Sequence, residues 1–178
     1  MRKLANEELN RKSVTEFRGS AKAPFLIVLD NVRSLNNIGS IFRTADAFLL
    51  EGIYLCGITA TPPHREIHKT ALGATESVAW KYFGSTVEAI EELKEHGYRI
   101  ISVEQAEGAV SLENFSPAED SRYALVFGHE VNGVSDDVIR LSDECIEIPQ
   151  YGTKHSFNIA VSAGIVLWEI FRKSSFYR

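Results

Sequence analysis

Two short, almost purely apolar runs constrain the fold of this chain more than any other feature. Residues 25–29 are Phe-Leu-Ile-Val-Leu and residues 123–127 are Tyr-Ala-Leu-Val-Phe. Strands that are apolar on both faces must be covered on both faces, which is typical of a parallel sheet flanked by helices. Because these runs alternate with stretches of helical periodicity, we predict an α/β fold with a mostly parallel sheet and helices on both faces.

The other expected elements alternate along the chain in the same way. The spacing of Leu4, Leu9, Val14 and Phe17 predicts one amphipathic N-terminal helix. We expect strands at 25–30, 53–57, 78–82, 98–103, 123–127 and 144–148, and later helices at about 37–49, 66–72, 85–95 and 157–173. A chain of 178 residues suits one such domain. We therefore divide it into a short helical arm, residues 1–24, and one α/β domain, residues 25–178.

Composition and charge exclude several classes of protein. Cys56 and Cys145 lie far apart in apolar runs, which favours free thiols and a reducing, cytoplasmic setting. The polar N-terminus has no apolar core of a signal peptide, and no apolar run is long enough for a membrane helix. A net charge of −5 argues against indiscriminate coating of nucleic acid, although a local basic patch is compatible with it. Candidates for that patch are Arg2, Lys3, Arg11, Lys12, Arg18, Lys22, Arg172, Lys173 and Arg178.

Polar side chains gather where three of the expected strands end. The three segments are 31–44, 128–135 and 149–158, and together they carry Asn, Arg, Glu and Ser side chains. In open α/β sheets the ligand lies at the carboxyl ends of the strands. The sequence therefore predicts one composite site at that edge.

Each segment also has a plainer interpretation. Asn36 and Asn37 could simply cap a helix, or the helix start could bind a phosphate. Arg43 could serve that site or form a surface ion pair with Asp46 or Glu51. Ser156 could likewise be only a helix cap.

Several familiar site types do not match. Residues 128–135 have neither the GxGxxG pattern of dinucleotide sites nor the Gly-Lys-Ser/Thr of a P-loop. His155 beside Ser156 lacks the GxSxG context of a hydrolase. His64 and His68 do not fit HExxH, so we expect a solvated turn and helix there and no metal site. The expected C-terminal helix is apolar nearly all round, which favours a partner subunit.

Together the three segments resemble the SpoU/TrmH family of RNA ribose 2′-O-methyltransferases, in the SPOUT superfamily. The first motif has Asn37 with Arg43 six residues later, and the second is Phe-Gly-His-Glu-Val-Asn-Gly-Val-Ser with Glu130. The third runs from Ile148 through Ser156 and Asn158. The resemblance covers roughly residues 25–172.

The resemblance implies a fold, a cofactor and an assembly. The C-terminal part would thread a loop to form a deep trefoil knot, a rare exception to unknotted topology. S-adenosylmethionine would bind in the knot, and the enzyme would be a homodimer with its active sites at the subunit interface. The residues that would contact the cofactor are Gly128, Ile148, Phe157, Val103, Glu104 and Pro149.

The implied reaction is methylation of a ribose 2′-hydroxyl in tRNA or rRNA, which needs no metal. Arg43 would act as general base or, since guanidinium is a poor proton acceptor, as a clamp for phosphate and developing alkoxide. Asn37 and Ser156 would support the ribose or the arginine, Asn158 would fix the knot loop, and Glu130 would orient Asn37 or Arg43.

An alternative is a non-catalytic RNA-binding module that keeps the fold, although a pure binder has no use for the whole set. Larger family members carry an extra RNA-binding domain, whereas only about 24 residues precede the α/β domain here. We expect recognition by this domain, the dimer surface and the basic arm, with salt-sensitive binding.

Overall fold

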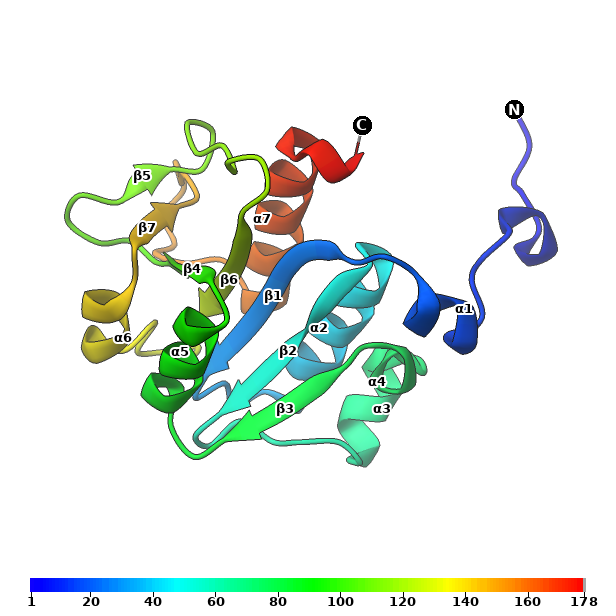
Figure 1. Cartoon of the computed structure of the whole chain (residues 1–178), viewed down its shortest axis with the longest axis horizontal. Helices are drawn as coiled ribbons and strands as arrows, with labels where there is room; N and C mark the ends of the chain where they lie inside the picture. The colour runs from blue at the N-terminus through cyan, green and yellow to red at the C-terminus, as the bar shows by residue number, and fades with distance from the viewer. Residues whose placement is uncertain (178) are drawn as a thin grey trace.

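The computed structural model describes residues 1–177, and within them seven strands form one parallel sheet in the order β3-β2-β1-β6-β4-β7-β5 (Figure 1). The strands are β1 (Ala23–Asp30), β2 (Leu50–Cys56), β3 (Trp80–Phe83), β4 (Tyr98–Val103), β5 (Val110–Ser111), β6 (Arg122–Phe127) and β7 (Glu144–Glu147). The helices are α1 (Val14–Gly19), α2 (Leu35–Ala47), α3 (Arg65–Ala71), α4 (Ala74–Ser77), α5 (Thr86–Glu95), α6 (Asp136–Leu141) and α7 (Ile159–Lys173), with short 3-10 helices η1 (Asn6–Leu9) and η2 (Ser175–Tyr177).

The two apolar runs form the centre of the sheet. Strand β1 pairs with β6 in parallel from Phe25 opposite Tyr123 to Leu29 opposite Phe127. All of these side chains are buried, and the rings of Phe25 and Tyr123 stack with centroids 6.0 Å apart. The predicted parallel sheet is therefore confirmed, and every strand pairing in it is parallel.

Helices cover both faces of this sheet, as predicted (Figure 1). Alternate residues of β1 point to opposite faces, so Ile27 and Leu29 join one apolar cluster while Leu26 and Val28 join the other. The first cluster holds the buried faces of α2, α3 and α7, and the second holds those of α5 and α6.

The N-terminal arm differs from the single helix that we expected. It contains η1 and the short α1, and between them Asn10 adopts a left-handed conformation. Leu4, Leu9 and Val14 are exposed, and Phe17 is the one residue of the predicted amphipathic pattern that enters the core. An amphipathic pattern does not hold a helix together when its apolar face has nothing to pack against.

Three elements that we did not predict, α4, α6 and β5, are all short. Strand β5 has two half-buried residues, and α6 buries only Val138. No helix in residues 1–177 is long and apolar enough to cross a membrane. Both cysteines are free: Cys56 is buried, which raises the pKa of its thiol to about 12, and Cys145 is only partly buried.

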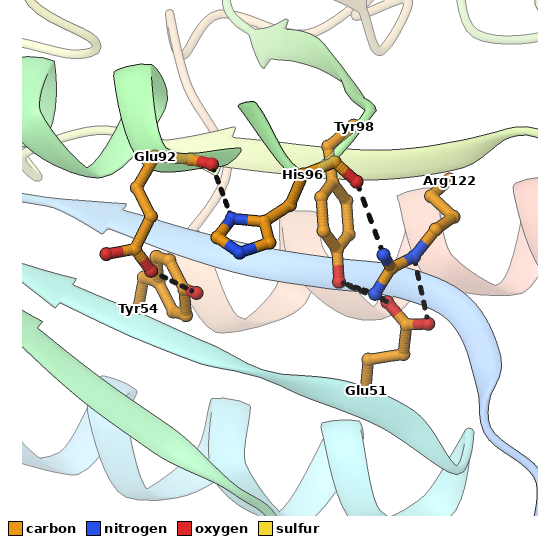
Figure 2. Close-up of polar contacts among 6 residues, drawn as sticks. All are labelled: Glu51, Tyr54, Glu92, His96, Tyr98 and Arg122. Atoms are coloured by element: carbon orange, nitrogen blue, oxygen red, sulfur yellow. Dashed lines mark hydrogen bonds and ion pairs between the residues drawn. The ribbon is translucent and has the colours of Figure 1, made fainter. Parts of the chain in front are cut away.

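A network of polar side chains joins the strands near their amino ends (Figure 2). We call Glu51, Tyr98 and Arg122 the amino-edge network. The Arg122 guanidinium donates to both Glu51 carboxylate oxygens, at 3.3 and 3.1 Å, and lies 4.1 Å from the ring centroid of Tyr98. The Tyr98 hydroxyl donates to Glu51 and accepts from Arg122. This network ties β2, β4 and β6 together across β1.

Candidate active site

The loop after β1 is held by a carboxylate from a distant segment. Oxygens of Glu130 accept from the backbone N–H of Arg33 at 3.0 Å and of Ser34 at 2.8 Å. The Asn37 side chain donates from Nδ2 to Glu130 at 3.3 Å. Burial would raise the pKa of Glu130, but these hydrogen bonds outweigh it and lower that pKa below its usual value.

Ser34, and neither Asn36 nor Asn37, is the N-cap of α2. Its hydroxyl accepts from the Asn37 N–H at 3.3 Å, so Asn37 lies in the first turn with its amide free to reach other segments. The capping interpretation of the two asparagines is therefore wrong.

Asn158 joins the third segment to the first two. As the N-cap of α7, its Oδ1 accepts from the N–H groups of Ala160 and Val161, at 3.0 and 3.4 Å. Its Nδ2 donates to the Asn37 Oδ1 at 3.1 Å. We call Asn158, Asn37 and Glu130 the carboxyl-edge network. Helix α7 starts two residues later than expected, and Ser156 is not its cap.

A cleft of about 520 Å³ borders this network. Of the residues expected to contact a cofactor, Pro149 does not line the cleft and the other five do; Glu130, Ser156 and Asn158 line it as well. Asn37 lies one hydrogen bond behind it. The lining comprises Val103, Glu104, Gln105, Phe127, Gly128, His129, Glu130, Val131, Asn132, Gly133, Glu147, Ile148, Gln150, His155, Ser156, Phe157, Asn158, Ile159 and Ser162.

Two glycines are required by the turn that forms one wall. His129 and Gly133 bond backbone to backbone in both directions, at 2.9 and 2.8 Å. A Cβ on Gly128 would lie 2.0 Å from the carbonyl carbon of Gly133. Gly133 itself has φ of +68°, and a Cβ there would meet Glu104 at 2.1 Å.

The end of β4 is bonded to both neighbouring walls. The Glu104 carboxylate accepts from the Val134 N–H at 3.0 Å and from the Gln105 N–H at 2.9 Å. The Gln105 Nε2 donates to the His155 carbonyl at 2.6 Å, the only hydrogen bond that residues 149–157 make within the described chain. We did not predict Gln105; its place directly after Glu104, in a fourth strand-end loop, was the available signal.

Arg43 lies apart from this assembly. It is exposed on α2, and its side chain has no hydrogen bond or ion pair with any residue in 1–177. Six helical residues after Asn37, it is about 9 Å further along the axis and about a third of a turn around it. The alternative ion pairs do not form, because Glu51 pairs with Arg122 and Asp46 accepts from Ser77.

The His64–His68 segment has a structural role within its own helix. The His64 Nδ1 accepts from the Glu66 N–H at 3.2 Å and so caps α3. Across residues 1–177 there is no group of three or more His, Cys, Asp or Glu side chains that could hold a metal ion.

Comparison with known proteins assigns the family. A model described as the SpoU rRNA Methylase family matches residues 24–168. A Staphylococcus haemolyticus protein named "Putative TrmH family tRNA/rRNA methyltransferase" is 32% identical over 148 residues, which are 83% of this chain and 58% of that protein. This chain thus spans a little over half the length of the curated relatives that it matches.

Solved structures agree in fold. The AdoMet-bound rRNA methyltransferase from Sinorhizobium meliloti has a TM-score of 0.79 and 28% identity, over 88% of this chain and 59% of that one. A structure described as "Structural insights into the 2-OH methylation of C/U34 on tRNA" has a TM-score of 0.74 and 25% identity, over 85% of this chain and 97% of that one. From its fold and its matching motifs, the chain belongs to the SpoU rRNA methylase family.

Proposed function

We propose that this protein is an S-adenosylmethionine-dependent methyltransferase that acts on a ribose 2′-hydroxyl of tRNA or rRNA. The observation that carries the proposal is the meeting of three distant segments at one cleft, through the bonds from Asn158 to Asn37 and from Asn37 to Glu130. The names of the S. meliloti relative and of the tRNA 2-OH methylation structure support the cofactor and the type of reaction.

The cleft fits the proposed cofactor in size and charge. Its volume lies within the usual range for small-molecule sites. Three carboxylates line it, those of Glu104, Glu130 and Glu147, and they suit a ligand of net positive charge. S-adenosylmethionine supplies a methyl group on a positively charged sulfonium. Gly128, Ile148 and Phe157 would hold it, with Val103 and Glu104 beside them.

Asn37 would support the ribose or the arginine from just behind the cleft wall. Its Oδ1 is occupied by Asn158, and one hydrogen of its Nδ2 is occupied by Glu130, so the amide orientation is fixed. The second Nδ2 hydrogen remains for a substrate oxygen. Ser156, at the wall of the cleft, would support the same oxygen or the arginine.

Arg43 would clamp the phosphate beside the reactive ribose and stabilise the developing alkoxide, because guanidinium stays protonated in proteins and is a poor base. Since a single chain leaves Arg43 outside the cleft, we propose a homodimer whose sites form at the subunit interface. The face of α7 that does not pack on the core supports this, because Val161 on it is 50% exposed and Trp168 is 53% exposed.

We also propose that residues 148–158 take part in the knot typical of the superfamily. This segment passes between Gln105, after β4, and Asn37, at the start of α2. The residues ahead of β1 would form an arm of the knotted domain, with its exposed basic residues, such as Arg11 and Lys12, available to RNA.

Calorimetry with S-adenosylmethionine tests the cofactor first. We expect saturable heat of binding, and its absence at millimolar ligand would sink the enzyme proposal. RNA binding without cofactor binding would instead favour the non-catalytic module. Nucleoside mass spectrometry of tRNA and rRNA from a deletion strain then identifies the product, which should be one missing 2′-O-methyl nucleoside restored by the wild-type protein.

Subunit mixing tests the shared site. Arg43→Ala and Glu130→Gln should each be inactive alone. If each site takes Arg43 from the partner subunit, mixed dimers should contain one intact site and recover part of the wild-type rate. Failure of mixed dimers to recover any rate would place Arg43 and Glu130 of each site in the same chain.

A further inference from the structure

A second pocket, which we call the Trp80 pocket, lies outside the site described above. It has a volume of about 450 Å³ and lies between α3, α4 and the start of the edge strand β3. Its lining comprises Pro62, Pro63, His64, Arg65, Ile67, His68, Thr75, Glu76 and Trp80. None of these residues belongs to the three motifs.

Four of the nine lining residues have a planar indole, imidazole or guanidinium group. The Trp80 side chain is large and the residue is 38% exposed, and His64 and His68 are exposed beside it. Because the His64 Nδ1 accepts a backbone hydrogen bond, the neutral ring carries its hydrogen on Nε2, where it can donate to a ligand. An indole, two imidazoles and a guanidinium are the groups that stack on nucleobases.

The lining carries one cationic and one anionic side chain, those of Arg65 and Glu76, and Arg18 adds a second positive charge beside it. Arg65 is exposed and has no hydrogen bond or ion pair among residues 1–177. Arg18, from the N-terminal arm, donates to the backbone carbonyl of Glu76 rather than to a carboxylate, so its charge is not neutralised. Glu76 is the one carboxylate in the lining. The pocket thus complements an anion, in a protein of net charge −5.

The pocket is rigidly connected to the carboxyl-edge network. The Thr70 hydroxyl of α3 donates to the Asn36 carbonyl of α2 at 3.1 Å. A Cβ on Gly39 would lie 2.3 Å from the Ile67 carbonyl oxygen, so α2 and α3 pack backbone to backbone. Helix α3 therefore keeps a fixed position relative to Asn37.

We propose that the Trp80 pocket holds an unpaired nucleobase of the RNA substrate, stacked on Trp80, with the adjoining phosphate bound by Arg65. This inference rests on the proposed function only for its choice of RNA as the ligand. It deepens that function, because a fixed second contact selects RNAs with an unpaired nucleotide at a set distance from the reactive ribose.

Intrinsic fluorescence with a short single-stranded oligoadenylate tests the pocket without requiring methyl transfer. The chain has two tryptophans, so the emission lost in Trp80→Phe is that of Trp80. We expect the oligonucleotide to quench this component, and Trp80→Ala to weaken binding at least tenfold while Trp80→Phe keeps most of it. Ile58→Ala is the matched control, since Ile58 is exposed but outside the pocket, and it should bind as the wild type does.

Equal binding by Trp80→Ala and the wild type would overturn the inference, and so would quenching that does not involve Trp80. A change in oligomeric state on Trp80→Ala, seen by light scattering, would also overturn it and make the pocket a protein interface. Oligoadenylate binding at Trp80 by a protein that shows no binding of S-adenosylmethionine at millimolar ligand would refute the proposed function and leave this inference standing. Methyl transfer to tRNA or rRNA at the same rate in Trp80→Ala and the wild type would support the proposed function and refute this inference.

Discussion

The amino-edge and carboxyl-edge networks lie at opposite edges of the same sheet and share one design. Each is centred on a glutamate that joins segments distant in sequence: Glu51 connects β2 to β4 and β6, while Glu130 connects its own turn to the start of α2. In both, the carboxylate accepts several hydrogen bonds. Bond count therefore does not separate a structural network from a functional one.

What separates the two networks is what surrounds them. Arg122 at the amino edge stacks on Tyr98 and donates to Glu51, so each charged group there has an internal partner (Figure 2). The carboxyl edge borders a cleft, and Ser156, which lines it, has no hydrogen-bond partner within residues 1–177. A polar group left without a partner at a cleft marks the site, and mutations at the two edges should have opposite consequences.

The largest effect should come from Arg43→Ala. We expect turnover to fall by at least about 100-fold, the usual cost of removing a group that stabilises transition-state charge. The melting temperature should not change, because Arg43 makes no bond within residues 1–177. Single-turnover methylation and thermal denaturation measure the two quantities. A variant that is active but less stable would make Arg43 part of the scaffold.

At the other edge, Arg122→Ala should lower stability and spare activity per folded molecule. It leaves Glu51 without its ionic partner, and we expect a loss of about 2 kcal/mol in the free energy of unfolding. Arg140→Ala is the control, because its pair with Asp137 is an exposed i,i+3 contact, for which less than about 0.5 kcal/mol is expected. Urea titration gives both values, and equal losses would contradict the view that the Arg122 network is structural.

Asn158 allows helix capping and network formation to be separated at one residue. Asn158→Ala should cost about 1 kcal/mol through the lost cap and should also reduce turnover. Asn158→Ser keeps a capping oxygen but loses the donor to Asn37, so stability should recover while turnover stays low. Full recovery of turnover in the serine variant would show that the bond to Asn37 does not matter to the reaction.

Gln105→Ala should weaken cofactor binding more than it slows the reaction. The variant loses the hydrogen bond to the His155 carbonyl, which releases residues 149–157. Because one such hydrogen bond contributes about 1 kcal/mol, the affinity for S-adenosylmethionine should fall roughly fivefold. Gln150→Ala is the matched control, since Gln150 lines the same cleft without such a bond. Calorimetry would reveal equal affinities if the bond has no role in positioning this wall.

The smallest effects concern the pH dependence of the free energy of unfolding, and they should appear at opposite ends of the pH scale. Burial, followed by the bond to Glu92, raises the pKa of Tyr54 to about 12. Between about pH 10 and 12 the folded protein keeps the Tyr54 phenol proton that the unfolded chain loses. The contribution of Tyr54 to the free energy of unfolding is therefore intact below about pH 10 and is lost as the pH rises toward 12. Tyr54→Phe should flatten that alkaline loss in pH-dependent urea titrations, and an unchanged slope would exclude Tyr54 as its source.

The pKa shift of Glu130 has the opposite sign to that of Tyr54. Because the pKa of Glu130 is lowered in the folded chain, its contribution to the free energy of unfolding is intact above the normal carboxyl pKa. That contribution is lost as the pH falls through the lowered value. Glu130→Gln should therefore flatten the acid side of the same titration. An acid side that is unchanged in Glu130→Gln would exclude Glu130 as the source of the acid-side loss.

The central fold could be predicted because its signals are long and consistent. The runs at 25–29 and 123–127 are apolar throughout, which is typical of strands buried on both faces of a parallel sheet. Strand β5 and helix α6 carry too few residues to give a period. The helix predicted for the N-terminal arm was too long, because the spacing of apolar residues does not indicate whether another surface is present for them to pack against.

The site was predictable as a set of segments but not as a set of bonds. The motifs bring Asn37, Glu130 and Asn158 to one edge, whereas side-chain partners depend on rotations that spacing does not determine. Ser34 replaced the asparagines as the cap of α2, and Asn158 replaced Ser156 as the cap of α7, because Ser and Asn serve equally well as caps. Gln105 belongs to no motif, and its bond to the His155 carbonyl became visible only in three dimensions.

The strand order has a consequence for how the chain is made. The central register places Phe25 against Tyr123, so the middle of the sheet waits for a segment synthesised much later. Such a high contact order predicts slow folding, with β1, β2 and β3 assembling first as the chain leaves the ribosome. The cleft takes its walls from the ends of β4, β6 and β7 and from the start of α7. A nascent chain therefore acquires its binding site only after the start of α7 has been synthesised.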